Sequence, residues 1–138
     1  MKEELIKFDT AVLAKEKRFD WECRFLYKSK DGWEEGLGVD YNWNSFNSCS
    51  APTQSLLQKW LREVHNIHIE IMLYHMHGEW VGPKYKYGIY SICQSEAEWD
   101  NKNGFGMEPC FHDENENSTY EEALEEGLYE ALKLIETK

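Results

Sequence analysis

The sequence predicts an α+β domain in which two main helices lie on one face of a three- or four-stranded antiparallel sheet, after a short N-terminal helix. Apolar residues recur at spacings of three and four over about 53–65 and 119–135, which is typical of helices that bury one side. Two pairs of segments with alternating polarity are each separated by turn residues, which indicates antiparallel hairpins. The length of 138 residues is that of a single domain, and we predict one domain over residues 1–138.

The first third of the chain predicts a helix and a hairpin. Thr10 is a preferred helix-capping residue, and the alanines and the leucine after it give a small apolar side, so we expect a short helix over residues 10–17. Residues 21–28 alternate as a half-buried strand does. An Asp-Gly pair then signals a hairpin turn, which predicts a second strand over residues 33–40.

The middle of the chain predicts a helix and two strands. Pro52 suits the first turn of a helix, because proline lacks an N–H that would have no partner there, and we expect the helix over about 53–65. Residues 67–76 alternate with bulky side chains on both faces, which predicts a central strand that pairs with residues 84–93. The expected core residues are Trp60, Leu61, Ile69, Ile71, Leu124 and Leu128.

The last third predicts a long acidic loop and a final helix. Residues 94–117 hold seven acidic side chains, four Asn, two Gly and one Pro, and we expect a loop throughout. Ser118, with Glu121 three positions later, forms a capping-box pattern that begins the helix over about 119–135. One side of this helix is apolar, and its glutamates predict a solvated face made of Glu121, Glu122, Glu125, Glu126 and Glu130.

Charge is distributed unevenly along the chain. There are 15 Lys and Arg against 26 Asp and Glu, a formal net charge of −11. Residues 94–138 carry three basic and thirteen acidic side chains, so most of the negative charge lies there. Such a surface repels the phosphates of nucleic acids and of anionic membranes, which makes neither an expected partner. A protein that binds this surface should be basic.

The sequence also bears on the compartment. It has no run of 18 apolar residues, and charges occupy the start, where a signal peptide needs an apolar run, so we expect a cytoplasmic protein. The cysteines form no CxxC pair, which predicts free thiols and no structural zinc. Cys49 precedes a predicted helix whose N-terminus could activate it, which makes it a candidate nucleophile.

A group of histidines offers a candidate metal site. His75 and His77 are two positions apart on a predicted strand, so their side chains point the same way and could bind one ion. His68 and Glu70 belong to the opposite face of that strand and cannot complete the site. A metal-dependent enzyme that uses the His-x-His pair is therefore one alternative, and structural or surface histidines are the other. We otherwise expect no cofactor.

Several large aromatic residues occur in weakly predicted strands or in predicted loops, where the pattern does not require their burial in a core. They either form a binding surface or fold back over the open face of the sheet. In the binding alternative, three of them join the glutamates of the last helix in a partner surface. The predicted partner-binding residues are Trp99, Phe105, Phe111, Glu121, Glu122, Glu125 and Glu126.

Four segments, TAVLAKEKRF, APTQSLLQKWLREVHNIHIEI, KYKYGIYSI and TYEEALEEGLYEALKLI, carry a resemblance. Their layout resembles a family of small proteins found in phages and prophages of gut bacteria. The likeness covers about half of the chain, and it is most specific in the middle and last helices. It implies a phage context, and it brings no catalytic or binding residues.

Together these observations predict a non-enzymatic, phage-type accessory protein. We expect it to bind a basic host or phage protein through an acidic surface that carries aromatic residues. The two alternatives are the metal-dependent enzyme and a homodimeric scaffold, which would form if the uncovered face of the sheet were apolar.

Overall fold

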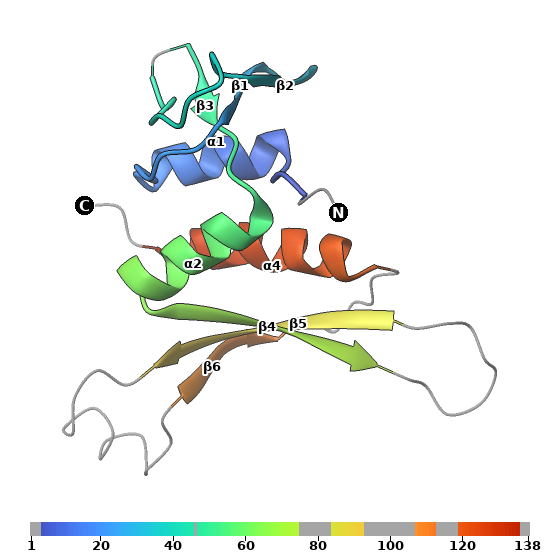
Figure 1. Cartoon of the computed structure of the whole chain (residues 1–138). Coiled ribbons are helices and arrows are strands. Elements are labelled where there is room, and N and C mark those ends of the chain that lie inside the picture. Colours follow the sequence, from blue (N-terminus) through green and yellow to red (C-terminus); the bar gives the residue numbers. More distant parts are fainter. Residues whose placement is uncertain (1–3, 46, 75–83, 93–106, 113–118, 136–138) are drawn as a thin grey trace.

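Two three-stranded antiparallel sheets lie at opposite ends of a stack whose middle is helical, as Figure 1 shows. The computed structural model describes residues 4–45, 47–74, 84–92, 107–112 and 119–135. In order along the chain, the elements are α1 (Phe8–Glu16), β1 (Phe25–Ser29), β2 (Gly32–Glu35), β3 (Cys49–Ser50), α2 (Gln54–Val64), β4 (Ile67–Tyr74), β5 (Lys84–Ile92), β6 (Met107–His112) and α4 (Tyr120–Lys133).

The sheet beneath the helices has the strand order β4-β5-β6, and all its pairs are antiparallel. The hairpin of β4 with β5 confirms the predicted pairing, with Ile69 opposite Ile89. The prediction that residues 67–76 form a central strand was wrong, because β5 lies between β4 and β6. The prediction of a loop throughout residues 94–117 was also wrong, because β6 forms within it and hydrogen bonds to β5.

Helices α2 and α4 pack on one face of this sheet, which confirms the predicted α+β class. The face is apolar where the helices lie, since Ile67, Ile69, Tyr87 and Ile89 are all buried there. All of the predicted core residues except Ile71 are buried, and Ile71 is partly buried against the same cluster. Burial of apolar surface at about 25 cal/mol per Å² drives this packing.

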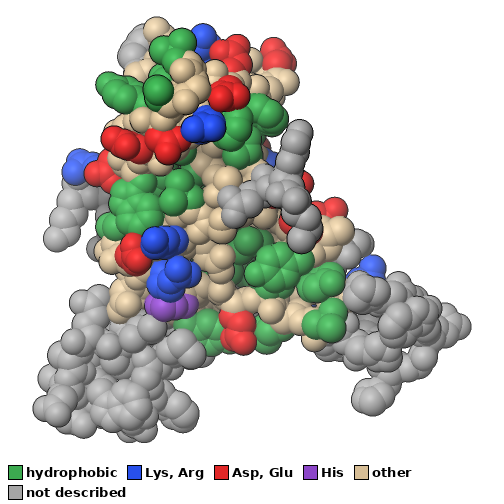
Figure 2. Space-filling view, viewed as in Figure 1, with side chains coloured by type: hydrophobic (Ala, Val, Ile, Leu, Met, Phe, Trp, Pro, Cys, Tyr) green, Lys and Arg blue, Asp and Glu red, His purple; other side chains and the backbone are tan. Residues whose placement is uncertain are grey.

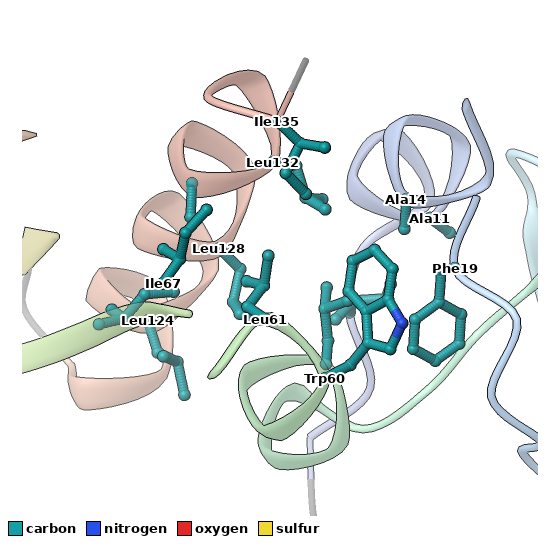
Figure 3. Packing of buried hydrophobic residues seen from close by; sticks show 14 of the residues in the cluster. Ala11, Ala14, Phe19, Trp60, Leu61, Ile67, Leu124, Leu128, Leu132 and Ile135 are labelled. Atoms are coloured by element: carbon teal, nitrogen blue, oxygen red, sulfur yellow. The ribbon is translucent and has the colours of Figure 1, made fainter. Parts of the chain in front are cut away.

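Trp60 extends the core from α2 toward α1. Figure 3 shows its indole beside Phe19, Ala11 and Ala14, whereas Leu61 points toward α4. The rings of Trp60 and Phe19 meet edge to face, with their centroids 5.2 Å apart. The small side chains of α1 leave room for these large rings. Helix α2 therefore packs against α1 through Trp60 and against α4 through Leu61.

The first hairpin, which the Asp-Gly turn predicted, does not join this sheet. Strand β1 pairs with β2 on one side and with the two-residue β3 on the other. Strand β3 follows a segment rich in Asn and Ser, residues 41–48, which joins the hairpin to it. This smaller sheet contacts α1 and lies on the far side of the helices from β4–β6 (Figure 1).

Two helix starts differ from their predictions by a small shift. Helix α1 begins at Phe8 with Lys7 as its N-cap residue, so Thr10 lies inside the helix, where it is buried. At α4 the N-cap residue is Thr119, whose Oγ1 accepts a hydrogen bond of 3.1 Å from the backbone N–H of Glu122. The predicted cap, Ser118, lies outside the described residues. Thr119 and Glu122 have the same spacing as the predicted capping-box pair, one position further along.

Gly127 sets how closely α4 approaches the sheet. A Cβ atom at this position would lie 3.0 Å from Cγ2 of Ile69 and 3.2 Å from Cγ of Tyr87, which is tighter than ordinary van der Waals contact. Glycine is unfavourable in a helix interior by about 1 kcal/mol relative to alanine. The close approach of helix and sheet explains why glycine stands here.

We predict that Gly127→Leu lowers the free energy of unfolding by about 1–3 kcal/mol, because the new side chain overpacks the boundary between α4 and the sheet. Urea denaturation followed by circular dichroism measures the change. The control is Glu63→Leu at an exposed position of α2, which should stay within about 0.5 kcal/mol of the original chain. Equal stabilities of the two variants would contradict the packing argument.

Candidate functional site

An acidic cleft lies where the first described residues, the start of α2 and the start of α4 meet. Its volume is about 350 Å³. It is lined by four carboxylates and one ammonium group, together with apolar and uncharged polar side chains. The lining residues are Glu4, Leu5, Lys7, Gln54, Glu121, Glu122, Glu125 and Thr119.

Backbone hydrogen bonds hold the two walls that come from the first half of the chain. Leu5 bridges to Thr53 as in an antiparallel pair, and the backbone N–H of Gln54 donates to the carbonyl of Glu4 at 2.8 Å. The side-chain amide of Gln54 then crosses to α4, where its Nε2 donates to the carbonyl of Glu121 at 2.9 Å. The cleft therefore has fixed walls from three separate segments.

Glu125 forms the buried end of the cleft. The prediction that it lies on the solvated face of the last helix was wrong, because only 6% of its surface is exposed. Its Oε1 accepts hydrogen bonds from the backbone N–H of Lys7 at 3.1 Å and from Nε2 of Gln54 at 3.3 Å, and its Oε2 accepts one from the hydroxyl of Thr10. Three donors thus compensate the burial of one carboxylate.

Three other glutamates of α4 lie on the solvated face, whereas Glu130, also predicted there, is half-buried and pairs with Lys133 at 3.1 Å. Glu121, Glu122 and Glu126 are exposed, as predicted for a solvated face. Tyr120 beside them is 45% exposed, and its ring meets that of Tyr85 edge to face, with centroids 6.3 Å apart. Carboxylates in the first turn also stabilise the helix itself through its dipole. The exposed rim of the cleft is therefore negatively charged, and Tyr120 directly precedes its first glutamate on the same helix.

The aromatic part of the predicted partner surface is described only in part. Trp99 and Phe105 lie outside the described residues. Phe111 belongs to β6, where it is the register partner of Ile89. Other exposed aromatics lie at the smaller sheet, where Trp33 is 51% exposed and Tyr41 is 58% exposed. Each of these two rings is about half exposed and also packs on a second ring, Trp33 on Phe25 and Tyr41 on Trp43.

The metal prediction falls on residues that the structure does not describe, since His75 and His77 both follow the end of β4. Within the described ranges, no group of three or more His, Cys, Asp and Glu side chains could hold a metal ion. Cys49 lies in β3, not in a loop before the helix. Burial raises the pKa of the Cys49 thiol, and this effect exceeds the opposing effect of Lys15, so the thiol is not activated as a nucleophile.

Sequence reasoning missed Glu4, Lys7 and Gln54 as parts of the cleft. No local pattern marks them, because they reach the last helix only through contacts between residues 67 to 118 positions apart. The alternation and capping patterns on which the predictions rested describe neighbours within a few positions. Among the residues that line the cleft, only the glutamates at the start of the last helix could be recognised from a sequence pattern.

Two described histidines, His65 and His68, have lowered pKa values in the folded chain. His65 follows α2, and its ring meets that of Trp60 edge to face with centroids 4.6 Å apart. Burial lowers the pKa of His65. Burial, and then the positive charge of Arg62, lower the pKa of His68. Both imidazoles therefore take up a proton less readily in the folded chain than in the unfolded chain.

Comparison of the chain with protein-family models, with curated proteins and with solved structures found no match. None of the described helices combines the length and the apolar character that a membrane crossing requires. The features of the chain that bear on function are the geometry of the cleft and its charge.

We predict that Glu125→Ala lowers the free energy of unfolding by about 2–4 kcal/mol, because it leaves three donors without their acceptor in a buried place. Glu125→Gln keeps one carbonyl acceptor and should cost less. Urea denaturation at neutral pH measures both. The exposed neighbour, Glu121→Ala, serves as the control and should change stability by less than about 0.5 kcal/mol. A similar loss in the control would contradict a special role for the buried carboxylate.

We also predict that the free energy of unfolding falls as the pH is lowered from 7.5 through 6.5. The unfolded chain binds protons at His65 and His68 before the folded chain does, because the folded pKa values are depressed. In the double variant His65→Gln/His68→Gln the fall over the same range should be smaller. Urea midpoints at several pH values test this, and an unchanged pH dependence in the variant would refute the assignment.

Proposed function

We propose that this chain is a non-enzymatic, phage-type accessory protein that binds a basic host or phage protein at the acidic cleft. The observation that carries the proposal is the lining of the cleft, in which four carboxylates accompany a single ammonium group. The resemblance of the sequence to small phage and prophage proteins supports the phage context.

The carboxylates of the cleft divide into two kinds. Glu125 already accepts three hydrogen bonds from the chain itself, so a partner has to engage the rim. Glu4, Glu121 and Glu122 are exposed, and each can accept hydrogen bonds from a lysine or arginine side chain. A cavity of about 350 Å³ admits one such side chain together with its flanking residues.

Tyr120 supplies the apolar part of the proposed contact. Tyr120 directly precedes the first glutamates of α4 along the chain and is 45% exposed, and its ring meets that of Tyr85. Tyrosine provides a large contact area at low conformational cost, and its ring attracts cations. An interface of this kind gains specificity and association rate from its charges, so its affinity should fall as salt screens them.

The two alternatives receive less support from the described residues. The metal-dependent enzyme depends on His75 and His77, which are not described. The homodimeric scaffold required an apolar open face on the sheet, and β4 presents His68, Glu70 and Met72 away from the helices. Glu70 is exposed on that face. Along β4 this face therefore carries polar as well as apolar side chains, which gives self-association less support.

The test is capture of partners from a bacterial lysate on the immobilised chain, with the captured protein then purified and its affinity measured at about 50 and 300 mM salt. We expect a basic partner that binds more weakly at the higher salt. Glu121→Lys/Glu122→Lys should weaken binding at least about tenfold, since two charge-assisted contacts become repulsive.

The matched control is Glu16→Lys/Glu63→Lys, which changes the net charge equally at exposed positions outside the cleft. This variant should keep most of the affinity. Equal losses in the two variants would show that only the overall charge matters. Binding that neither salt nor the cleft variant weakens would refute the proposal.

A further inference from the structure

A second and larger groove lies between the outer face of α2 and the segment that leads into β1. Its volume is about 620 Å³, within the range of small-molecule sites. Its charge pattern differs from that of the acidic cleft, because three basic side chains line it in a chain whose net charge is −11. This groove is independent of the site proposed for the protein partner.

The α2 wall of the groove is basic. Ser55, Lys59 and Arg62 are spaced by four and three positions, so they follow one another along one side of the helix. Both cations are exposed, and neither has a carboxylate within 4.0 Å in the ranges that the structure describes. Figure 2 shows Lys and Arg side chains gathered at the level of α2, beside a histidine and below a hydrophobic area.

The opposite wall is different in charge and in polarity. Arg24 forms an ion pair with Asp40 at 3.7 Å, so its charge is partly compensated, and Glu22 adds a further carboxylate. Phe25 at the start of β1 and Leu56 on α2 add half-buried apolar surface to the lining, which we call the apolar floor. The groove therefore combines a cationic side from α2, apolar surface and a side that carries hydrogen-bond acceptors.

We propose that this groove binds a small phosphate ester whose body is planar or apolar and carries hydroxyl or amino donors, the chemical class of nucleoside monophosphates. The phosphate would lie against Lys59 and Arg62, where charge-assisted hydrogen bonds are available. The body would cover Phe25 and Leu56, and its donors would reach the carboxylates of Asp40 and Glu22.

The same arrangement disfavours other ligands. A second phosphate further along the molecule would meet the carboxylates of the opposite wall, which repel it. A free inorganic phosphate would gain the basic wall alone and would leave the apolar floor open to water. A neutral nucleoside would cover the apolar surface of Phe25 and Leu56, but it would form no ion pair with Lys59 or Arg62. The best ligand is therefore one that carries a single phosphate at one end.

The experiment is a titration of the ¹⁵N-labelled chain, followed by amide shifts. The probes are AMP, GMP, CMP, UMP and phenyl phosphate, with adenosine and inorganic phosphate as partial ligands. We expect at least one monophosphate ester to shift residues of the groove, and to bind at least tenfold more tightly than adenosine or inorganic phosphate. Lys59→Ala/Arg62→Ala should weaken that binding at least tenfold.

The matched control is Lys28→Ala/Lys30→Ala, which removes the same charge from exposed positions outside the groove and should bind like the original chain. The amide spectrum of each variant shows whether it is folded. The inference is overturned if no ester shifts the groove residues at millimolar concentration. It is also overturned if the control variant loses as much affinity as the groove variant, or if inorganic phosphate binds as tightly as the best ester.

Discussion

The hydrogen-bonded carboxylate of Glu125 is the interaction on which the arrangement of the helices depends. It joins α4 to the backbone before α1, to the side chain of Thr10 within α1 and to Gln54 at the start of α2. Apolar packing alone allows helices to slide over one another, because dispersion and burial are not directional. A buried acceptor with three donors has a defined geometry, and it fixes where each helix begins relative to the others. The acidic cleft exists because these three starts converge.

The fold class followed from patterns that act over short distances. Spacings of three and four located α2 and α4, and alternation located the hairpin of β4 with β5, because both patterns report which side of an element is buried. The same reasoning missed β6, since its surroundings are rich in Asn, Gly and acidic residues that favour loops. It also made β4 central, because bulky residues on both faces resemble a strand buried on both sides. Both errors have one cause, which is the pairing of β6 with β5. This pairing makes residues 107–112 a strand and leaves β4 at the edge of the sheet.

The exposed rim of the acidic cleft could be predicted from the sequence, and Glu125 at its buried end could not. Exposed glutamates at the start of a helix have a local signal, and Glu121 and Glu122 lie as that signal indicated. Glu125 belongs to the same acidic run, and its sequence neighbours gave no reason to separate it from them. What distinguishes it is the arrival of Lys7 and Gln54 from far along the chain. A buried polar group of this kind is visible only once the tertiary contacts are known.

The joining of the first and last helices has a consequence for how the chain is made. The contacts of Glu125 with Lys7 and Thr10 span 118 and 115 positions. During synthesis, α1 leaves the ribosome long before α4 is made. Until then, Lys7 and Thr10 lack the carboxylate of Glu125 as their hydrogen-bond acceptor. The sheet β4–β6, built from neighbouring strands, needs much smaller loops to close. The contacts that join α1 to α4 can therefore form only after α4 has been synthesised, whereas the hairpin of β4 with β5 can form before it.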